Sequence, residues 1–151
     1  MVLRFADGRA FATGACPYLD WFSPERRETA RIFISVSIGE SQTQAMVDTG
    51  GVYFVCDPEV AELLDLDTPS LGNATLLIRG DRCEGSLHRH TVSIVAELGE
   101  SFEQEVTLFV PRLAYGQEWH LPSILGLQGC LEFLRFAVDP ATNTFYFGRL
   151  D

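Results

Sequence analysis

The sequence predicts a single, mostly β domain whose strands close into a sheet or barrel. Its 151 residues are enough for one domain with a hydrophobic core and too few for two domains that each have a sizeable core. Hydrophobic residues make up 46% of the chain and charged residues 21%, values typical of globular proteins. Many short apolar runs and only two short helical segments follow one another along the chain, and this pattern favours a closed β-sheet.

The clearest strand signal lies in residues 31–40, where apolar residues alternate with serine before a glycine turn. Residues 42–47 are the expected second arm of a hairpin, and residues 51–56 are a third apolar strand. Asp57 followed by Pro58 is typical of a helix start, because an aspartate caps the first turn and proline fits its first position. This helix is expected to end near residues 67–69.

The second half of the chain again alternates between strands and turns. It contains one polar stretch bracketed by Gly80 and Gly85, with an apolar run before it and an alternating run after it, as in a hairpin. The expected strands are residues 74–78, 87–95, 102–110, 123–126, 136–138 and 144–147. A loop is expected at 115–122, and one or two turns of helix at 129–134.

Charge and cysteine content indicate which partners and which cellular compartment to expect. A net charge of −10 argues against nucleic acid or an anionic membrane as a partner. No apolar run is long enough for a signal peptide or a membrane span, so a cytoplasmic location is expected. The cysteines show no paired spacing and are expected to be free thiols: Cys16, Cys56, Cys83 and Cys130. Residues 1–30 show no sustained periodicity and form an arm of unknown role ahead of a domain at 31–151.

An unusual feature lies in residues 45–51, where an apolar run ends in Asp48, Thr49 and two glycines. An unpaired carboxylate at the end of a buried strand costs several kcal/mol, so neighbouring groups must compensate for it. The Thr49 hydroxyl is one possible donor, and Gly50 permits a turn that directs its N–H toward the acid. The alternative is an ordinary turn aspartate that hydrogen-bonds its own loop.

The order of these features resembles that of the retroviral-type (retropepsin-like) aspartic protease family. The resemblance rests on a hairpin leading into Asp-Thr-Gly at 48–50, a helix started by Pro58, and a hairpin at the position of that family's flap. The triplet Ile-Leu-Gly at 124–126 follows, before a helix and a last hairpin. The similarity covers roughly residues 31–149. It implies a closed β-barrel with a flap and one or two short helices.

The resemblance also implies a chemistry: an aspartic-type endopeptidase that needs no cofactor and no metal. Two carboxylates that share one proton would activate water and polarise the scissile carbonyl, a pair for which aspartic proteases are the standard example. The residues implied as catalytic are Asp48, Thr49 and Gly50. Those implied to contact substrate are Gly51, Arg79, Gly80, Asp81, Arg82, Cys83, Glu84 and Gly85, and those implied to support the site are Ile124, Leu125 and Gly126.

The chain contains one Asp-Thr-Gly and no second copy. A mechanism that needs two equivalent aspartates therefore needs two chains, and the sequence predicts a homodimer with the site on its twofold axis. A peptide or protein is the expected substrate. Gly51 stands where the family usually carries alanine or serine, and the flap is charged. These two departures favour an alternative, a dimeric binding module that does not cleave peptides. A monomeric β-barrel for apolar ligands is a third possibility.

Two other groups of residues are candidates for a metal site or a catalytic pair. Cys83, His88 and His90 are candidate metal ligands, although a solvated hairpin arm is the better explanation because no fourth ligand is evident and the spacing matches no common zinc module. Cys83 with His120 is a conceivable Cys-His protease pair, but neither stands in a recognisable nucleophile context. The pair Trp119-His120 is interpreted as a loop anchor.

Overall fold

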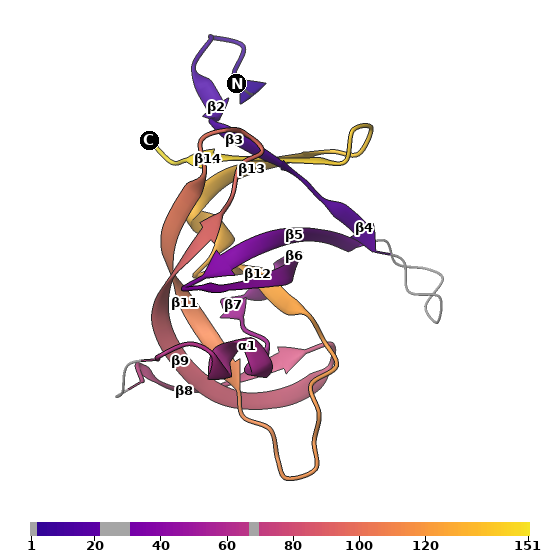
Figure 1. Ribbon diagram of the computed structural model, residues 1–151, viewed down its shortest axis with the longest axis vertical. Helices are drawn as coiled ribbons and strands as arrows, with labels where there is room; N and C mark the ends of the chain where they lie inside the picture. The colour runs from indigo at the N-terminus through magenta and orange to yellow at the C-terminus, as the bar shows by residue number, and fades with distance from the viewer. Residues whose placement is uncertain (1–2, 22–30, 67–69) are drawn as a thin grey trace.

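The computed structural model describes residues 3–21, 31–66 and 70–151 (Figure 1). Within these ranges the chain is almost entirely strand, as the sequence predicts, with one short α-helix and one turn of 3-10 helix. The strands of the first half are β1 (Leu3–Arg4), β2 (Ala10–Ala12), β3 (Gly14–Pro17), β4 (Leu19–Trp21), β5 (Arg31–Ile38), β6 (Ser41–Val52) and β7 (Phe54–Val55). Those of the second half are β8 (Gly72–Ile78), β9 (Asp81–Ile94), β10 (Leu98–Gly99), β11 (Phe102–Pro111), β12 (Ser123–Gln128), β13 (Leu134–Asp139) and β14 (Thr144–Arg149).

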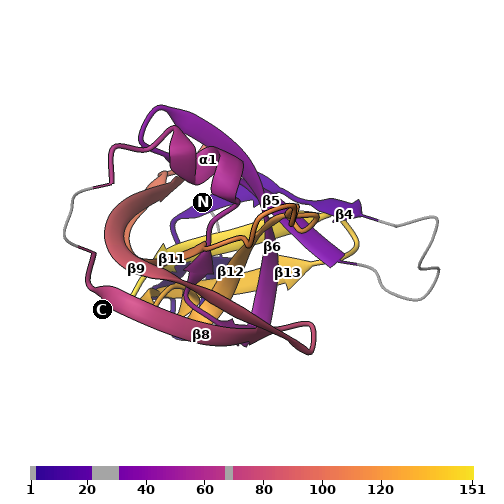
Figure 2. The same cartoon turned by 90° about the horizontal axis from the view of Figure 1, so that it is seen from below.

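The predicted closure of the sheet is confirmed, and β5 is the strand that completes it. The eight-stranded sheet has the order β4-β5-β6-β12-β7-β11-β9-β8, and β5 pairs with β9 as well as with β6. Six strands therefore form a closed ring, and β4 and β8 extend beyond it. A second sheet has the order β10-β3-β14-β13 and lies with the C-terminus at one end of the molecule, opposite the β8–β9 hairpin (Figure 1). Figure 2 shows how strongly β9 curves to close the ring.

The hydrophobic residues divide into two clusters. The larger one fills the barrel, with fully buried side chains such as Ile34, Val36 and Phe54. The alternation in residues 31–40 has this origin, because one face of β5 lines the barrel. The smaller cluster lies between the barrel wall and the β8–β9 hairpin, and it includes Met46, Phe109 and Ile124. The hairpin therefore does not pack tightly into the main core.

Sequence-based boundaries were wrong at the end of β6 and at both helices. Strand β6 continues through the predicted turn to Val52, and the next strand begins only at Phe54, because Tyr53 takes a positive φ of 63° between them. Helix α1 (Pro58–Glu62) is capped by the Asp57 carboxylate, which accepts from the Glu59 N–H at 2.9 Å, but it ends after five residues. Residues 67–69, where its end was expected, lie outside the described residues. The helix expected at 129–134 is one 3-10 turn, η1 (Leu131–Phe133).

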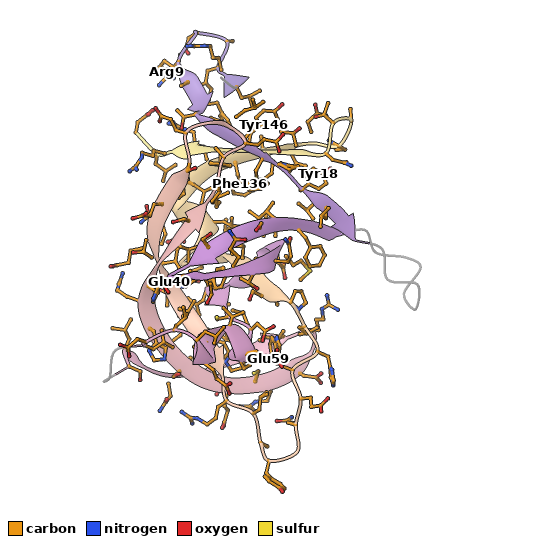
Figure 3. The ribbon with its side chains drawn as sticks, in the orientation of Figure 1. Arg9, Tyr18, Glu40, Glu59, Phe136 and Tyr146 are labelled. Atoms are coloured by element: carbon orange, nitrogen blue, oxygen red, sulfur yellow. The ribbon has the colours of Figure 1, made fainter. Side chains whose placement is uncertain are left out.

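In the described part of the N-terminal arm, β1 and β2 form a two-stranded sheet of their own, and β3 and β4 join the two larger sheets. Strand β3 lies between β10 and β14, and β4 pairs with β5, so the proposed division at residue 30 does not coincide with a break in the sheets. The side chain of Tyr18 is buried at 7% exposure and joins the main core. In Figure 3 Tyr18 lies beside the C-terminal strands, while Arg9 marks the end with the termini and Glu59 lies toward the opposite end. Residues 22–30 of the arm lie outside the described residues.

We expect deletion of residues 1–17 to prevent folding. The deletion removes β3, which exposes the pairing edge of β14 and uncovers part of the core. Deletion of residues 1–9, which removes β1 and leaves β3 in place, is the control and is expected to lower the midpoint of thermal unfolding only slightly. Circular dichroism with thermal unfolding distinguishes the two variants. A cooperative transition of the 1–17 deletion at the wild-type midpoint would show that the arm is dispensable.

Candidate functional site

Asp48 lies in the part of β6 that runs parallel to β12, directly opposite Gly126. Its Oδ1 atom accepts a hydrogen bond of 3.0 Å from the Gly50 N–H, the interaction expected from the glycine. Thr49 does not act as the second donor: its side chain is exposed, and its hydroxyl has no hydrogen-bond partner among the described residues. The Asp48 carboxylate is half-buried and has one backbone donor.

The backbone around Asp48 is packed most closely at Gly126. A Cβ atom at this position would lie 2.6 Å from the Tyr53 carbonyl oxygen and 2.7 Å from the carbonyl carbons of Gly51 and Val52. The Gly126 N–H also donates to the Tyr53 carbonyl at 2.9 Å. In contrast, a Cβ atom at Gly51 would make ordinary contacts, 3.5 Å from Asp48 Oδ2 and 3.4 Å from the Gly126 Cα. Close approach therefore requires glycine at position 126 and not at position 51.

The β8–β9 hairpin covers this region. Its loop is the two residues Arg79 and Gly80, with φ values of 53° and 86°, as a type I′ turn requires. The predicted polar stretch 79–85 is thus mostly strand, because the pairing resumes at Asp81. Arg79 reaches down from the turn and donates to the Met46 sulfur at 3.7 Å.

A cavity of about 300 Å³ lies between Asp48 and the hairpin. Its size is at the lower end of the range of ligand pockets. It brings together the predicted site residues Asp48, Gly50, Gly51, Arg79 and Ile124. Its other lining residues were not predicted from the sequence: Met46, Val52, Val55, Leu76, Leu77 and Ile78. The apolar run at residues 74–78, which the sequence predicts as a strand, is the signal that could have indicated part of this lining.

A second cavity, of about 720 Å³, lies on the other side of the hairpin turn. Ile78 and Arg79 line both cavities. The second cavity contains the predicted residues Asp81, Arg82, Cys83 and Glu84, together with residues of the loop that follows β11. Gly80 lines neither of these two cavities.

Two further predicted residues lie elsewhere. Leu125 belongs to the barrel core, where it is 2% exposed. Gly85 is buried against β11, where a Cβ atom would lie 2.6 Å from the Phe109 ring. Neither residue lines the two cavities, so Gly85 is placed to support the hairpin and not to contact a ligand.

The structure resembles a solved structure of a retropepsin-like aspartic protease from Rickettsia conorii. The two share 18% sequence identity with a TM-score of 0.54, and the match covers 89% of this chain and 93% of the other. The chain has a retropepsin-like fold. A retroviral protease-like domain of Ddi1 from Leishmania major also matches, with 13% identity, a TM-score of 0.48, and coverage of 82% of this chain and 97% of that domain. No protein-family model matches the chain, and its sequence matches no curated protein.

Within this retropepsin-like fold, the alternative metal site does not form. His88 and His90 share one face of β9, but Cys83 packs into the smaller cluster on the other face. His88 Nε2 instead lies 2.8 Å from the Ser86 hydroxyl, and partial burial lowers the pKa of His88. Among the described residues, no group of three or more His, Cys, Asp or Glu side chains could hold a metal ion. None of the helices in the described ranges has the length and apolarity that a membrane crossing requires.

The Cys-His alternative also lacks the necessary chemistry. Cys83 and His120 line the same large cavity, but burial raises the pKa of the Cys83 thiol, whereas a nucleophilic cysteine needs a lowered one. The Cys83 thiol contacts the Glu84 carbonyl at 3.7 Å, and His120 lies 3.8 Å from the Glu118 carboxylate. Cys83 is therefore an ordinary half-buried thiol of the hairpin.

We expect a thiol-reactive dye to label Cys83 alone in the folded protein. The other three cysteines are buried, and burial raises the pKa of Cys16 to about 11 and of Cys56 and Cys130 to about 12. Their thiols are therefore protonated and shielded from the dye. The rate at Cys83 is expected to increase with pH through and above pH 9, because only the thiolate reacts and burial raises its pKa. Mass spectrometry identifies which cysteine is labelled in the wild type and in the Cys83→Ser control. Rapid labelling of Cys56 or Cys130 before unfolding would contradict this expectation.

Proposed function

We propose that the protein is an aspartic-type endopeptidase that works as a homodimer, with Asp48 of each subunit at a shared site. The observation that carries the proposal is the position of Asp48. It lies half-buried, with its Oδ1 atom held by the Gly50 N–H, in a cavity covered by the β8–β9 hairpin. A structural turn aspartate has no need of a covered cavity beside it. The retropepsin-like fold is consistent with peptide cleavage but does not by itself establish it.

In the proposed mechanism two Asp48 carboxylates lie close enough to share one proton. The ionised Asp48 takes a proton from a bound water as the water oxygen attacks the scissile carbonyl carbon. The protonated Asp48 donates its proton to the carbonyl oxygen, which gives a tetrahedral diol. The C–N bond then breaks as the Asp48 that took the water proton gives it to the leaving nitrogen. The other Asp48 accepts a proton from the diol, so the products are a carboxylic acid and an amine and the pair again shares one proton.

Other residues would position the peptide. The apolar lining of the smaller cavity, with Val55 and Ile124 on the barrel side and Ile78 on the hairpin, suits a side chain next to the cleaved bond. The β8–β9 hairpin would close over the substrate as a flap. Gly126 permits the close backbone approach that holds the Asp48 loop in place.

The direct test is incubation of the protein with a diverse peptide mixture at several values between about pH 4 and pH 8. We expect internal cleavage, detected by mass spectrometry, and a dimer in light scattering. A monomer that cleaves peptides would overturn the shared site. A dimer that binds peptides without cleaving them at any pH would instead support the binding-module alternative, which the charged hairpin and Gly51 favour.

A further inference from the structure

Arg79 is a charged residue of the Asp48 cavity that the proposed mechanism does not use. Asp48 and Arg79 are the only charged residues among the described ones that line this cavity, and the rest of its lining is apolar or glycine. Arg79 Nη2 donates to the Met46 sulfur at 3.7 Å, and Met46 precedes Asp48 by two residues in β6 and lines the same cavity. A cation therefore lies near the proposed reaction site.

The backbone at Arg79 is not one that an arginine favours. Its φ of 53° is left-handed, and the first position of a two-residue type I′ turn usually carries asparagine, aspartate or glycine. An arginine at this position costs conformational free energy that those residues avoid. The turn geometry therefore does not explain the arginine. A residue that is unfavourable for the backbone, and that places a charge at a cavity, indicates a function for its side chain.

A carboxylate is a much better acceptor for the Arg79 guanidinium than the Met46 sulfur. A thioether accepts only weakly, whereas the two oxygens of a carboxylate match two of the guanidinium N–H groups and carry the opposite charge. Arg79 is exposed, so its side chain can exchange one partner for another without disruption of the hairpin. It also lines the larger cavity, beside loop residues such as Trp119, which packs with hairpin residues in the smaller cluster.

We propose that Arg79 binds a carboxylate of the substrate and makes the protein selective for acidic peptides. This inference rests on the proposed function, because it specifies the substrate of the same site. Residues two positions apart in a strand are separated by roughly 7 Å, so the bound carboxylate belongs to a residue within about two positions of the cleaved bond. It is the side chain of an aspartate or glutamate, or the C-terminal carboxylate of a short peptide. Arg79 is thus a specificity-determining residue.

The test measures peptide binding by the Asp48→Asn protein, so that cleavage does not interfere. The probe is the peptide that this protein retains best from a tryptic digest of serum albumin. It is synthesised in three forms: unchanged, with every Asp and Glu replaced by Asn and Gln, and with a C-terminal amide. We expect one of the two neutralised forms to bind about three- to tenfold more weakly than the unchanged peptide, a modest effect because solvent screens an exposed arginine. The form that weakens identifies the source of the carboxylate.

Adding Arg79→Asn should abolish the difference between the unchanged and the neutralised peptide while the Kd of the neutralised peptide stays the same. Asparagine suits the left-handed backbone, so the thermal midpoint of the free protein should be unchanged or higher. Adding Arg79→Lys instead keeps the charge and should retain part of the preference. If Arg79 served only to hold the hairpin closed through Met46, Arg79→Asn would weaken all three peptides equally.

Arg89→Gln is the matched control. It removes the same charge from β9 of the same hairpin, but Arg89 pairs with Glu105 at 3.5 Å and lines neither cavity. The preference for the unchanged peptide should remain. Equal Kd values for all three peptide forms, equal weakening of them by Arg79→Asn, the same loss with Arg89→Gln, or retention of no peptide would each overturn the inference. If the preference holds but the wild type cleaves no peptide, the proposed function fails and the carboxylate site stands.

Discussion

We expect the Asp48→Asn variant to cleave peptides at least about 10²- to 10⁴-fold more slowly than the wild type, the range typical of losing a general acid–base group. Asparagine cannot take a proton from water, and it cannot share one with a second carboxylate. Its side-chain oxygen still accepts a hydrogen bond, so the contact from the Gly50 N–H at 3.0 Å can be kept. The free energy of unfolding should therefore change by less than about 1 kcal/mol.

Asp139→Asn is the matched control for this prediction. Asp139 also accepts from the backbone N–H two residues ahead, that of Ala141, at 2.9 Å, but it is the last residue of β13 and lines neither cavity. Initial rates of peptide cleavage and thermal unfolding are measured for both variants. Wild-type cleavage by the Asp48→Asn protein, or an equal loss in the Asp139→Asn protein, would rule out Asp48 as the acid–base group.

The Gly126→Ala variant is expected to lose about 2–3 kcal/mol of stability, or more, through overpacking. The added methyl group would lie 2.6–2.7 Å from three backbone atoms of Gly51, Val52 and Tyr53, and no flexible side chain is available to move instead. For a chain of this length that loss corresponds to a thermal midpoint roughly 5–10 °C lower. Peptide cleavage should fall as well, because the shifted backbone carries Asp48.

Gly51→Ala is the control, since its methyl group would make only contacts of 3.4–3.5 Å in the same loop. Its stability should lie within about 1 kcal/mol of the wild type, and a small gain is consistent with reduced freedom of the unfolded chain. Thermal unfolding of the two variants side by side gives the comparison. Equal midpoints would mean that the backbone at Gly126 yields easily, and would remove the packing argument for this glycine.

The site could be anticipated only in part from the sequence, and the successes have local causes. The hydrogen bond from the Gly50 N–H to Asp48 follows from adjacent residues, and so does the cap of Asp57 on helix α1. For Thr49 the adjacent residues predicted a hydroxyl donor to Asp48, whereas its side chain is exposed and has no hydrogen-bond partner among the described residues. Trp119 was interpreted only as a loop anchor, because no sequence pattern connects it with a hairpin some forty residues earlier.

The sequence by itself determined the β class, the hairpin that leads to Asp48, and the single Asp-Thr-Gly from which the homodimer is proposed. These features depend on side-chain alternation and on turn or cap residues, which act over a few positions. Only the tertiary structure decided that β5 closes the barrel by pairing with β9, that β3 lies between β10 and β14, and that Asp48 and the hairpin enclose one cavity. The physical reason is that strand pairing joins distant segments through uniform backbone hydrogen bonds, so the choice of partner follows from how all the apolar faces are buried together.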